Sequence, residues 1–270
     1  MKFLQCLIFF IVISILINSC ARNPYGTTNK SYKKLAKSYA KVLAKYPIAD
    51  SVSNSPAFIG AVNFNMRKPN FVIIHHTAQD SCEQTLKTFT TVRSQVSAHY
   101  VICKDGTVHH MLNDYLRAWH GGISKWGNMT DINSSSIGIE LDNNGFESFS
   151  EPQINSLIEL LSRLKNAYNI PVANFIGHAD IAPGRKVDPN RYFPWQQLSE
   201  QGFGIWYDTT GVEVLPDFNA MQALRIIGYD IKKPEAAIYS FKLHFVATDT
   251  TTVITDADKK ILSALVNKYQ

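Results

Sequence analysis

Short apolar runs alternate with segments of helical periodicity from Phe58 to about residue 205, and this alternation constrains the fold more than any other feature. Five runs have the composition of strands: Phe71–Ile74, Tyr100–Cys103, Thr107–Met111, Ser136–Leu141 and Val172–Gly177. The second and third flank Asp105-Gly106, a dipeptide typical of two-residue hairpins, so we expect them to pair antiparallel.

Two of the connecting segments carry helix-start signals. Ser81-x-x-Gln84 has the pattern of a capping box, and Ser150-x-x-Gln153 repeats it with Pro152 in the first turn. Apolar residues at helical spacing follow each signal: Leu86, Phe89, Val92 and Val96 after the first, and Ile154, Leu157, Ile158, Leu161 and Leu164 after the second. The sequence therefore predicts an α/β domain, with a mixed central β-sheet flanked by helices.

The part of the chain beyond Gly211 is different in composition. Helical periodicity over residues 217–227, 234–245 and 255–269 predicts a small C-terminal three-helix domain. We expect four regions: a signal peptide over 1–19, a basic tether over 20–56, the α/β domain over 57–208 and the helical domain over 209–270.

The first 20 residues have the features of an export signal. After Lys2, the apolar run Leu7–Ile17 is too short to span a bilayer comfortably and fits the core of a signal peptide. It ends in Ile17-Asn18-Ser19-Cys20, which resembles a bacterial lipoprotein processing site, although Leu is usual where Ile17 stands. We expect lipid attachment at Cys20, with a plain secretory signal or an uncleaved anchor as alternatives. The non-acidic Ala21 favours the outer membrane, with the protein facing the periplasm.

Basic residues are concentrated in the tether, although the whole chain carries a formal net charge of only +5. Seven of them lie in the tether before the first acidic residue, Asp50: Arg22, Lys30, Lys33, Lys34, Lys37, Lys41 and Lys45. Because they lie outside the folded domain, nucleic-acid binding is a poor explanation of the charge. Apolar residues at helical spacing between Leu35 and Tyr46 predict that part of the tether is helical, and an anionic membrane surface is a suitable partner for it.

Cys82 and Cys103 are the cysteines of the predicted folded part. An oxidising compartment permits a disulfide between them, and buried free thiols are the alternative. Neither cysteine has the spacing of a zinc pair.

Two adjacent histidines, His75 and His76, follow the first predicted strand. Neighbours on a strand point to opposite faces, so one metal ion cannot easily bind both, and a structural role is the alternative. His178 follows the last predicted strand, and a loop rich in Pro and Gly can turn Asp188 back towards it. Two imidazoles and one carboxylate are a ligand set for a single zinc ion, with a fourth position left for water.

Two further charged residues fit the chemistry of such a site. Glu140 lies in a strand whose apolar residues alternate to the opposite face, which indicates either a cleft or a solvated strand face. In a cleft it would act as general base and then as proton donor to a leaving amine. Lys186, two residues before Asp188, would stabilise a tetrahedral oxyanion, and an ordinary surface lysine is the alternative.

A Gly-rich loop contains Trp119, His120 and Trp126. Aromatic and imidazole groups on a loop beside a cleft suit contact with a sugar or a peptide, and a loop anchored by buried Trp is the alternative. Three other histidines have no partner pattern and are assigned no role: His109, His110 and His244.

Five motifs over about residues 58–207 are similar, in their order, to those of the type-2 N-acetylmuramoyl-L-alanine amidases. They are Ile73-Ile74-His75-His76-Thr77-Ala78, Ala98-His99-Tyr100, Ala118-Trp119-His120-Gly121-Gly122, Ser136-Ile137-Gly138-Ile139-Glu140, and the segment from Gly177 to Pro189. The superfamily includes phage-lysozyme-type amidases and peptidoglycan recognition proteins. The resemblance implies hydrolysis of the amide between N-acetylmuramic acid and L-alanine of the stem peptide.

The resemblance also implies roles for particular residues: zinc binding by His75, His178 and Asp188, and catalysis by Glu140 and Lys186. We further expect substrate contact by Trp119, His120 and His99. Residues 221–231 resemble peptidoglycan-binding modules, with a domain that only packs on the catalytic one as the alternative. A noncatalytic recognition module is the main rival for the whole chain, and hydrolysis of another amide is a third hypothesis. Retention of the complete set of ligands and catalytic residues favours the enzyme. No pattern indicates an obligate protein partner.

Overall fold

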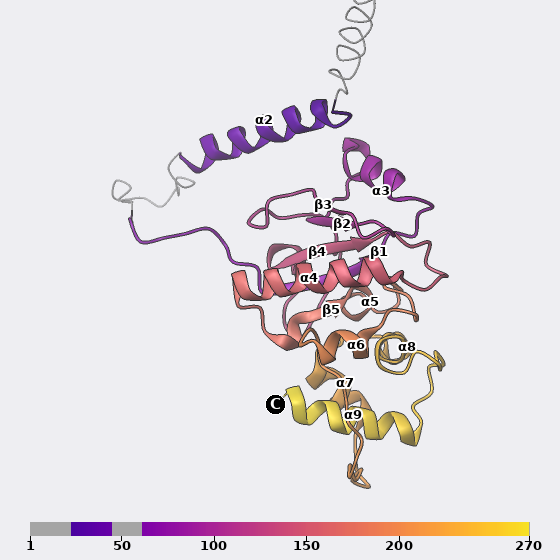
Figure 1. The fold of residues 1–270 in the computed structure, drawn as a ribbon. Helices are drawn as coiled ribbons and strands as arrows, with labels where there is room; N and C mark the ends of the chain where they lie inside the picture. Colours follow the sequence, from indigo (N-terminus) through magenta and orange to yellow (C-terminus); the bar gives the residue numbers. More distant parts are fainter. Residues whose placement is uncertain (1–22, 45–60, 270) are drawn as a thin grey trace, which may run out of the picture. The chain divides into compact units, whose positions relative to one another are not determined.

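The computed structural model describes residues 23–44 and 61–269. The chain divides into two compact units, residues 1–64 and 65–270. In the first, helix α2 spans Gly26–Leu43 (Figure 1). The predicted signal peptide and Cys20 lie outside the described residues. Among the helices that the structure describes, none is both long enough and apolar enough to cross a membrane.

The second unit is built on a five-stranded mixed sheet with the strand order β3-β2-β4-β1-β5. Its strands are β1 (Phe71–His76), β2 (Tyr100–Ile102), β3 (Val108–His110), β4 (Ser136–Leu141) and β5 (Phe175–Gly177). Strand β1 pairs in parallel with β4 and β5, and β2 pairs in parallel with β4. The hairpin predicted around Asp105-Gly106 is confirmed, because β2 and β3 are antiparallel with Tyr100 opposite His110.

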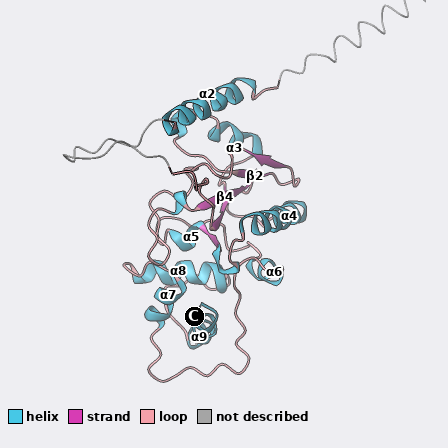
Figure 2. Cartoon of the chain, turned by 90° about the vertical axis from the view of Figure 1, so that its left-hand side faces the viewer, coloured by secondary structure: helices cyan, strands magenta, loops and turns pink. Residues whose placement is uncertain are grey.

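Alternation along β1 divides the hydrophobic core between the two faces of the sheet. Val72 and Ile74 belong to one buried cluster, which contains the apolar side of α4 (Glu151–Tyr168). Phe71 and Ile73 belong to a second cluster, which contains residues of the short helix α5 and of the C-terminal helices. Figure 2 shows α4 on one side of the strands and α5 on the other.

The remaining helices of this unit are α3 (Cys82–Phe89), α5 (His178–Ile181), α6 (Trp195–Glu200), α7 (Ala220–Ile227), α8 (Pro234–Phe245) and α9 (Asp256–Tyr269). The serine half of each predicted capping box is present, because the Ser81 and Ser150 hydroxyls accept from the amides of Gln84 and Gln153. The glutamine side chains bind elsewhere: Gln84 accepts from the Asp80 amide, and Gln153 donates to the carbonyls of Ile102 and Asp142. Thr255 and Asp258 cap α9 reciprocally. The three predicted C-terminal helices are therefore confirmed, and their apolar faces complete the second cluster.

Several predicted elements are shorter than expected, and two of them show the physical reason. The helix after Ser81 ends at Phe89, because Thr90 and Thr91 turn their hydroxyls back onto carbonyls of the last turn. Val92, expected on its apolar face, is exposed. The strand predicted from Val172 begins only at Phe175, after a turn of 3₁₀ helix over Val172–Asn174.

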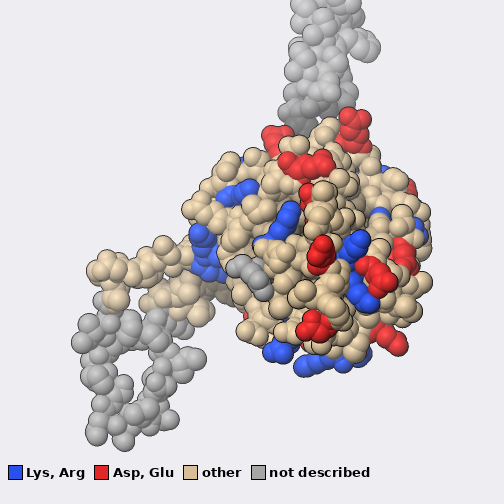
Figure 3. Space-filling model, turned by 90° about the horizontal axis from the view of Figure 1, so that it is seen from below, with Lys and Arg blue, Asp and Glu red and all other residues tan. Residues whose placement is uncertain are grey.

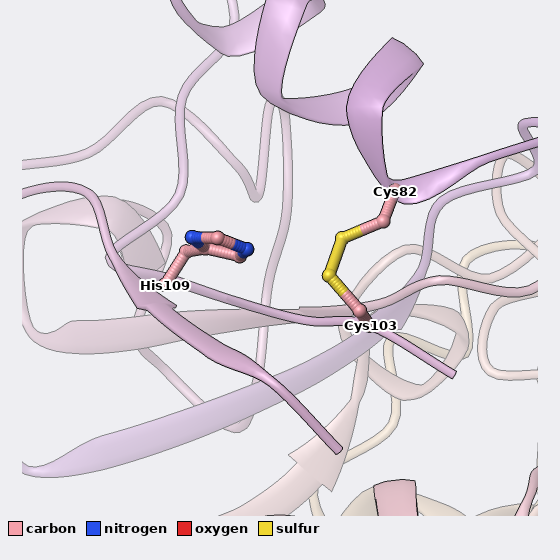
Figure 4. A group of neighbouring side chains, drawn as sticks. All are labelled: Cys82, Cys103 and His109. Atoms are coloured by element: carbon pink, nitrogen blue, oxygen red, sulfur yellow. A yellow bond between two sulfur atoms is a disulfide. The ribbon is translucent and has the colours of Figure 1, made fainter. Parts of the chain in front are cut away.

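Cys82 and Cys103 form a disulfide, which decides between the two alternatives left by the sequence (Figure 4). The bond joins the first residue of α3 to the residue after β2. His109 lies close to both sulfur atoms, but sulfurs bonded to each other are not thiolate ligands for a metal. The disulfide therefore ties α3 to the sheet.

The C-terminal side of this unit is mixed in charge. Figure 3 shows acidic and basic side chains interspersed on the face seen from below α9 in Figure 1. A surface of this kind offers no extended basic patch to a polyanion.

Candidate metal centre and active site

The parallel strands bring the candidate residues to one edge of the sheet. His75 is near the carboxyl end of β1, Glu140 is at the paired position of β4, and His178 directly follows β5. Because β1 lies between β4 and β5, these side chains meet even though they are far apart in the sequence. The next residue, His76, alternates to the other side of β1, where its ring lies beside Gly145, and it contributes to the lining of the cavity together with His75.

Three ligand atoms converge at this edge. His75 Nδ1 and His178 Nδ1 lie 2.9 Å apart, and Asp188 Oδ2 lies 3.0 Å from the first and 2.9 Å from the second. All three side chains are buried. The loop that carries Asp188 is fastened to α5, because the amide of Ala179 donates to the Asp188 carbonyl at 2.7 Å.

The outer nitrogen of His178 fixes its tautomer. His178 Nε2 lies 3.1 Å from the carbonyl oxygen of Gly121, which can only accept a hydrogen bond, and farther, at 3.3 Å, from Arg185 Nη2, which already donates to that carbonyl. The proton of the neutral imidazole is therefore on Nε2. Its Nδ1 carries a lone pair that faces Asp188 and His75.

A chain of hydrogen bonds fixes His75 in the same way. The Ser136 hydroxyl donates to the Ile132 carbonyl at 2.7 Å, so it accepts from His120 Nε2 at 3.1 Å. His120 Nδ1 is then the acceptor for His75 Nε2 at 3.0 Å, and His75 Nδ1 has no proton. Burial and the neighbouring His178 lower the pKa of His75 to about 4, which keeps this imidazole neutral at pH 7.

The site therefore presents two imidazole lone pairs and a carboxylate oxygen to one point. Without a cation these three electron-rich atoms would repel one another. Two imidazoles and a carboxylate are a donor set that zinc prefers, and tetrahedral zinc places its ligand atoms roughly 3.3 Å apart. Donation of the outer imidazole N–H to a carbonyl or another acceptor is typical of zinc-binding histidines. The residues thus fit a zinc ion.

Glu140 and Lys186 lie beside these ligands. Glu140 Oε1 is 4.0 Å from His75 Nδ1, and its side chain is 12% exposed. Burial first, and then the negative charge of Asp188, raise the pKa of Glu140 well above its ordinary value, and Lys186 opposes the shift. Both residues line the same cavity. A carboxylate with a raised pKa is suited to taking and returning a proton near neutral pH.

A cavity of about 400 Å³ opens above the three ligand atoms. One wall comes from the region of α3 and includes Thr85, Thr88 and Phe89. Trp119, which is 49% exposed, forms part of the rim. The size suits a small ligand or the reacting part of a larger one.

The three predicted substrate contacts have different positions. Trp119 and His120 line the cavity, whereas His99 does not. Both ring nitrogens of His99 are engaged inside the protein, Nε2 with the Leu116 carbonyl and Nδ1 with the Gly138 amide. His120 is buried, and its two ring nitrogens face His75 and Ser136. These hydrogen bonds orient the His75 ring.

Sequence reasoning missed the residues that orient the ligands, namely Ser136 and the carbonyl of Gly121. One signal was available, because Gly138 stands in the middle of a strand, where glycine often marks a close approach. A Cβ at Gly138 would lie 2.4 Å from the His120 ring. Arg185, also missed, reaches the cavity and donates to the Gly121 carbonyl.

The chain is similar to characterised proteins over most of its length. The family described as N-acetylmuramoyl-L-alanine amidase matches residues 65–191. N-acetylmuramoyl-L-alanine amidase AmiD of Escherichia coli is 34% identical over 230 residues, which cover 73% of this chain and 82% of that protein.

Solved structures agree with these matches. The complex of Escherichia coli AmiD with anhydro-N-acetylmuramic acid-L-Ala-D-γ-Glu-L-Lys superposes with a TM-score of 0.68 at 31% identity, covering 78% of this chain and 93% of that one. AmpDh3 of Pseudomonas aeruginosa, in complex with anhydromuramic pentapeptide, gives a TM-score of 0.69 at 28% identity, covering 82% and 99%.

Proposed function

The chain belongs to the N-acetylmuramoyl-L-alanine amidase family, and from this membership we propose that it is a zinc-dependent peptidoglycan amidase. It hydrolyses the amide between N-acetylmuramic acid and L-alanine of the stem peptide. Two similar structures hold anhydromuramoyl peptides, which supports this class of substrate for the cavity above the ligand atoms.

One observation supports this proposal most directly: His75, His178 and Asp188 direct two lone pairs and a carboxylate oxygen to one point at the base of a cavity. These residues would hold the zinc ion. Bound there, zinc would supply Lewis-acid chemistry, polarising the carbonyl under attack and lowering the pKa of a water nucleophile towards about 7.

The protein's own residues carry the proton transfers. Glu140 accepts a proton from the attacking water and then delivers it to the nitrogen of the leaving L-alanine. The same cavity contains Lys186, whose ammonium group stabilises the negative charge that develops on the carbonyl oxygen. Trp119 at the rim offers a flat apolar surface to the sugar or the peptide.

A noncatalytic recognition module is the rival function. It would bind the same muropeptides and would not need Glu140. The buried position of Glu140 beside the ligands favours the enzyme. Burying an isolated carboxylate costs free energy, and a catalytic role accounts for its retention at this position.

A muropeptide digest separates the two. The full chain is incubated with purified muropeptides and the products are separated by chromatography, with and without a chelator. We expect release of stem peptide, loss of release with chelator, and recovery when zinc is added. Intact muropeptides in the presence of bound zinc would establish the recognition module.

We also propose that the chain is held at the cell envelope by a lipid on Cys20, with α2 lying on the membrane surface. Five lysines of α2, Lys30, Lys33, Lys34, Lys37 and Lys41, share one side of the helix. The opposite side carries exposed apolar residues: Tyr32, Leu35, Tyr39, Val42 and Leu43. No acidic residue occurs in α2. A helix with these two faces suits the surface of an anionic bilayer.

Hydrogen exchange on the full chain tests the membrane contact. We expect the amides of α2 to be protected in vesicles of phosphatidylglycerol and phosphatidylethanolamine and to exchange rapidly in phosphatidylcholine vesicles. Val42→Ser should reduce the protection, whereas Lys34→Arg, which keeps the charge, should not. Equal exchange in both lipids would contradict the proposal for α2, whatever the state of Cys20.

A further inference from the structure

Asp180 connects the candidate metal centre to the C-terminal helices. It lies in α5, two residues after the ligand His178, and is 1% exposed. Its Oδ1 accepts a hydrogen bond from the Tyr229 hydroxyl at 2.7 Å, and its Oδ2 accepts one from His244 Nδ1 at 2.8 Å. Tyr229 follows α7 and His244 is in α8, and both are buried.

The same carboxylate holds the backbone that presents the ligand. Asp180 Oδ2 also accepts from the amide of Gly177, the residue before His178, at 2.7 Å. Gly177 is tightly enclosed, because a Cβ there would lie 2.9 Å from Pro189 Cδ and 3.1 Å from Trp195 Cζ2. The Trp195 ring in turn stacks on His244, with 3.9 Å between ring centroids. His244 therefore fixes the His178 backbone both through Asp180 and through Trp195.

A second set of contacts reaches the loop that orients the ligand side chains. Tyr229 packs edge-on against Trp126, with 5.0 Å between ring centroids. The amide of Gly127 donates to the Gly228 carbonyl at 2.7 Å, and that of Lys125 donates to the Ile181 carbonyl of α5 at 2.8 Å. The loop that contains Lys125 and Gly127 begins with His120 and Gly121. His120 Nδ1 accepts from the outer nitrogen of His75, and the Gly121 carbonyl accepts from that of His178.

From these contacts we propose that Tyr229 and His244 are positioning residues for the zinc site, and that the C-terminal helices serve to hold the ligand His178 in place. The inference rests on the proposed zinc-dependent function. Tyr229 and His244 contact neither the ligand atoms nor the cavity, so they act through Asp180, Gly177 and Trp195. Support of this kind around zinc ligands typically changes metal affinity by about 10–100-fold.

Metal binding by the folded chain tests the inference without any activity measurement. Zinc affinity is measured by competition with a chromogenic chelator for the full chain and for Tyr229→Phe and His244→Gln. We expect each variant to bind zinc about tenfold more weakly. With Co²⁺ in place of zinc, the visible absorption of both variants should differ from that of the parent, because a shifted ligand changes the coordination geometry.

Lys242→Met is the matched control in the same helix. Lys242 is buried, and its Nζ binds Asp249, Asp258 and the Val253 carbonyl. The substitution leaves Asp258 buried without its cation and should lower the melting temperature. Zinc affinity and the Co²⁺ spectrum should stay at the parental values, which separates positioning from general stability.

The possible results are distinguishable. Parental zinc affinity and Co²⁺ spectrum in both variants would overturn the inference and leave the proposed function intact. Equal weakening in Lys242→Met would overturn it as well. A parental chain that binds no zinc would overturn the proposed function itself. If His244→Gln does not fold, Tyr229→Phe decides, because it removes one hydroxyl and keeps the ring packed on Trp126.

Discussion

At His75 and His76 a single peptide bond separates two residues with different surroundings. His75 Nδ1 faces His178 and Asp188, whereas His76 packs against Gly145 on the other face of the sheet. The His76 Nδ1 atom is buried and has no hydrogen-bond partner among the described residues. The two positions therefore form a natural pair for testing which imidazole binds the metal.

We expect His75→Ala to abolish stoichiometric zinc binding, because it removes one of three ligand atoms. His76→Ala should retain one zinc ion per chain, since its side chain lies on the opposite face. Metal content after dialysis, measured by mass spectrometry, checks both. Loss of zinc in His76→Ala but not in His75→Ala would show that His76 is the ligand and would contradict this assignment.

Glu140→Gln keeps the shape of the side chain and removes its ability to accept a proton. We expect kcat on muropeptides to fall by roughly 10²–10⁴-fold, with zinc affinity unchanged. Steady-state kinetics and zinc titration on the same preparation provide the two readouts. Undiminished kcat would exclude Glu140 as the general base.

Gly138→Ala places a methyl group against the His120 ring, where a Cβ would lie 2.4–2.7 Å from three ring atoms. A strand residue normally gains stability from this substitution. Here we expect a loss of about 1–3 kcal/mol in the free energy of unfolding, because both the strand and the ring are fixed. Urea denaturation measures it, and an unchanged or higher midpoint would show that the ring moves aside freely.

At the level of single residues, the sequence predicts those whose side chains are typical metal ligands. The motif order indicates His75, His178 and Asp188, and the structure brings their ligand atoms together. Asp180, Tyr229 and His244 were not identified, because Tyr229 and His244 contact Asp180 from 49 and 64 positions away. Such pairs depend on how helices cross, which periodicity does not specify.

Among the helices, the capping residues in the sequence predict where a helix starts better than periodicity predicts where it ends. The capping residues Ser81, Ser150 and Thr255 each stand before a helix, because a side-chain acceptor satisfies amides that the helix leaves open. The end of α3 depended on Thr90 and Thr91, whose hydroxyls compete for backbone carbonyls. Apolar periodicity continued past them and predicted a longer helix than the one that forms.

The connection between α8 and α9 should be sensitive to acid. The hydrogen bond from Lys242 first, and then those from Thr251, lower the pKa of Asp249 from 3.8 to about 2. A carboxylate with a depressed pKa stabilises the folded state above its unfolded pKa, and the contribution is lost as pH falls through the folded value. We therefore expect the free energy of unfolding to drop between about pH 3.8 and pH 2.

Asp249→Asn isolates this contribution. The variant should be less stable at neutral pH and should lose less stability than the parent over the same acid range. Urea unfolding at closely spaced pH values measures both curves. Parallel curves for the two proteins would show that Asp249 does not contribute to the acid response.

Across the whole molecule, the main difference from expectation is how closely the C-terminal helices join the sheet. Their presence was predicted from periodicity, but Ile227, Phe241 and Leu262 share one buried cluster with Phe71 and Ile73 of β1. Composition shows that a helix has an apolar face and does not show which surface covers it. The relation of these helices to the candidate metal centre is therefore visible only in the structure.

Metal removal should affect the stability of residues 65–270 as a unit. A ligand that binds only the folded state stabilises it by about 2.7 kcal/mol at a free concentration 100 times its Kd. We expect a chelator to lower the melting temperature of the full chain and zinc to restore it. His75→Ala, measured in parallel by calorimetry, should show no response to either addition. If neither the chelator nor zinc changes the melting temperature of the parental chain, this would argue against a bound metal.

The place of β1 between β4 and β5 has a consequence for how the protein is made. His75 is synthesised 103 positions before His178 and 113 before Asp188, and the contacts from Tyr229 and His244 are made later still. Contacts between such distant positions form only after the intervening chain has been ordered. A metal site built from His75, His178 and Asp188 would therefore form only after the chain has been made at least as far as Asp188.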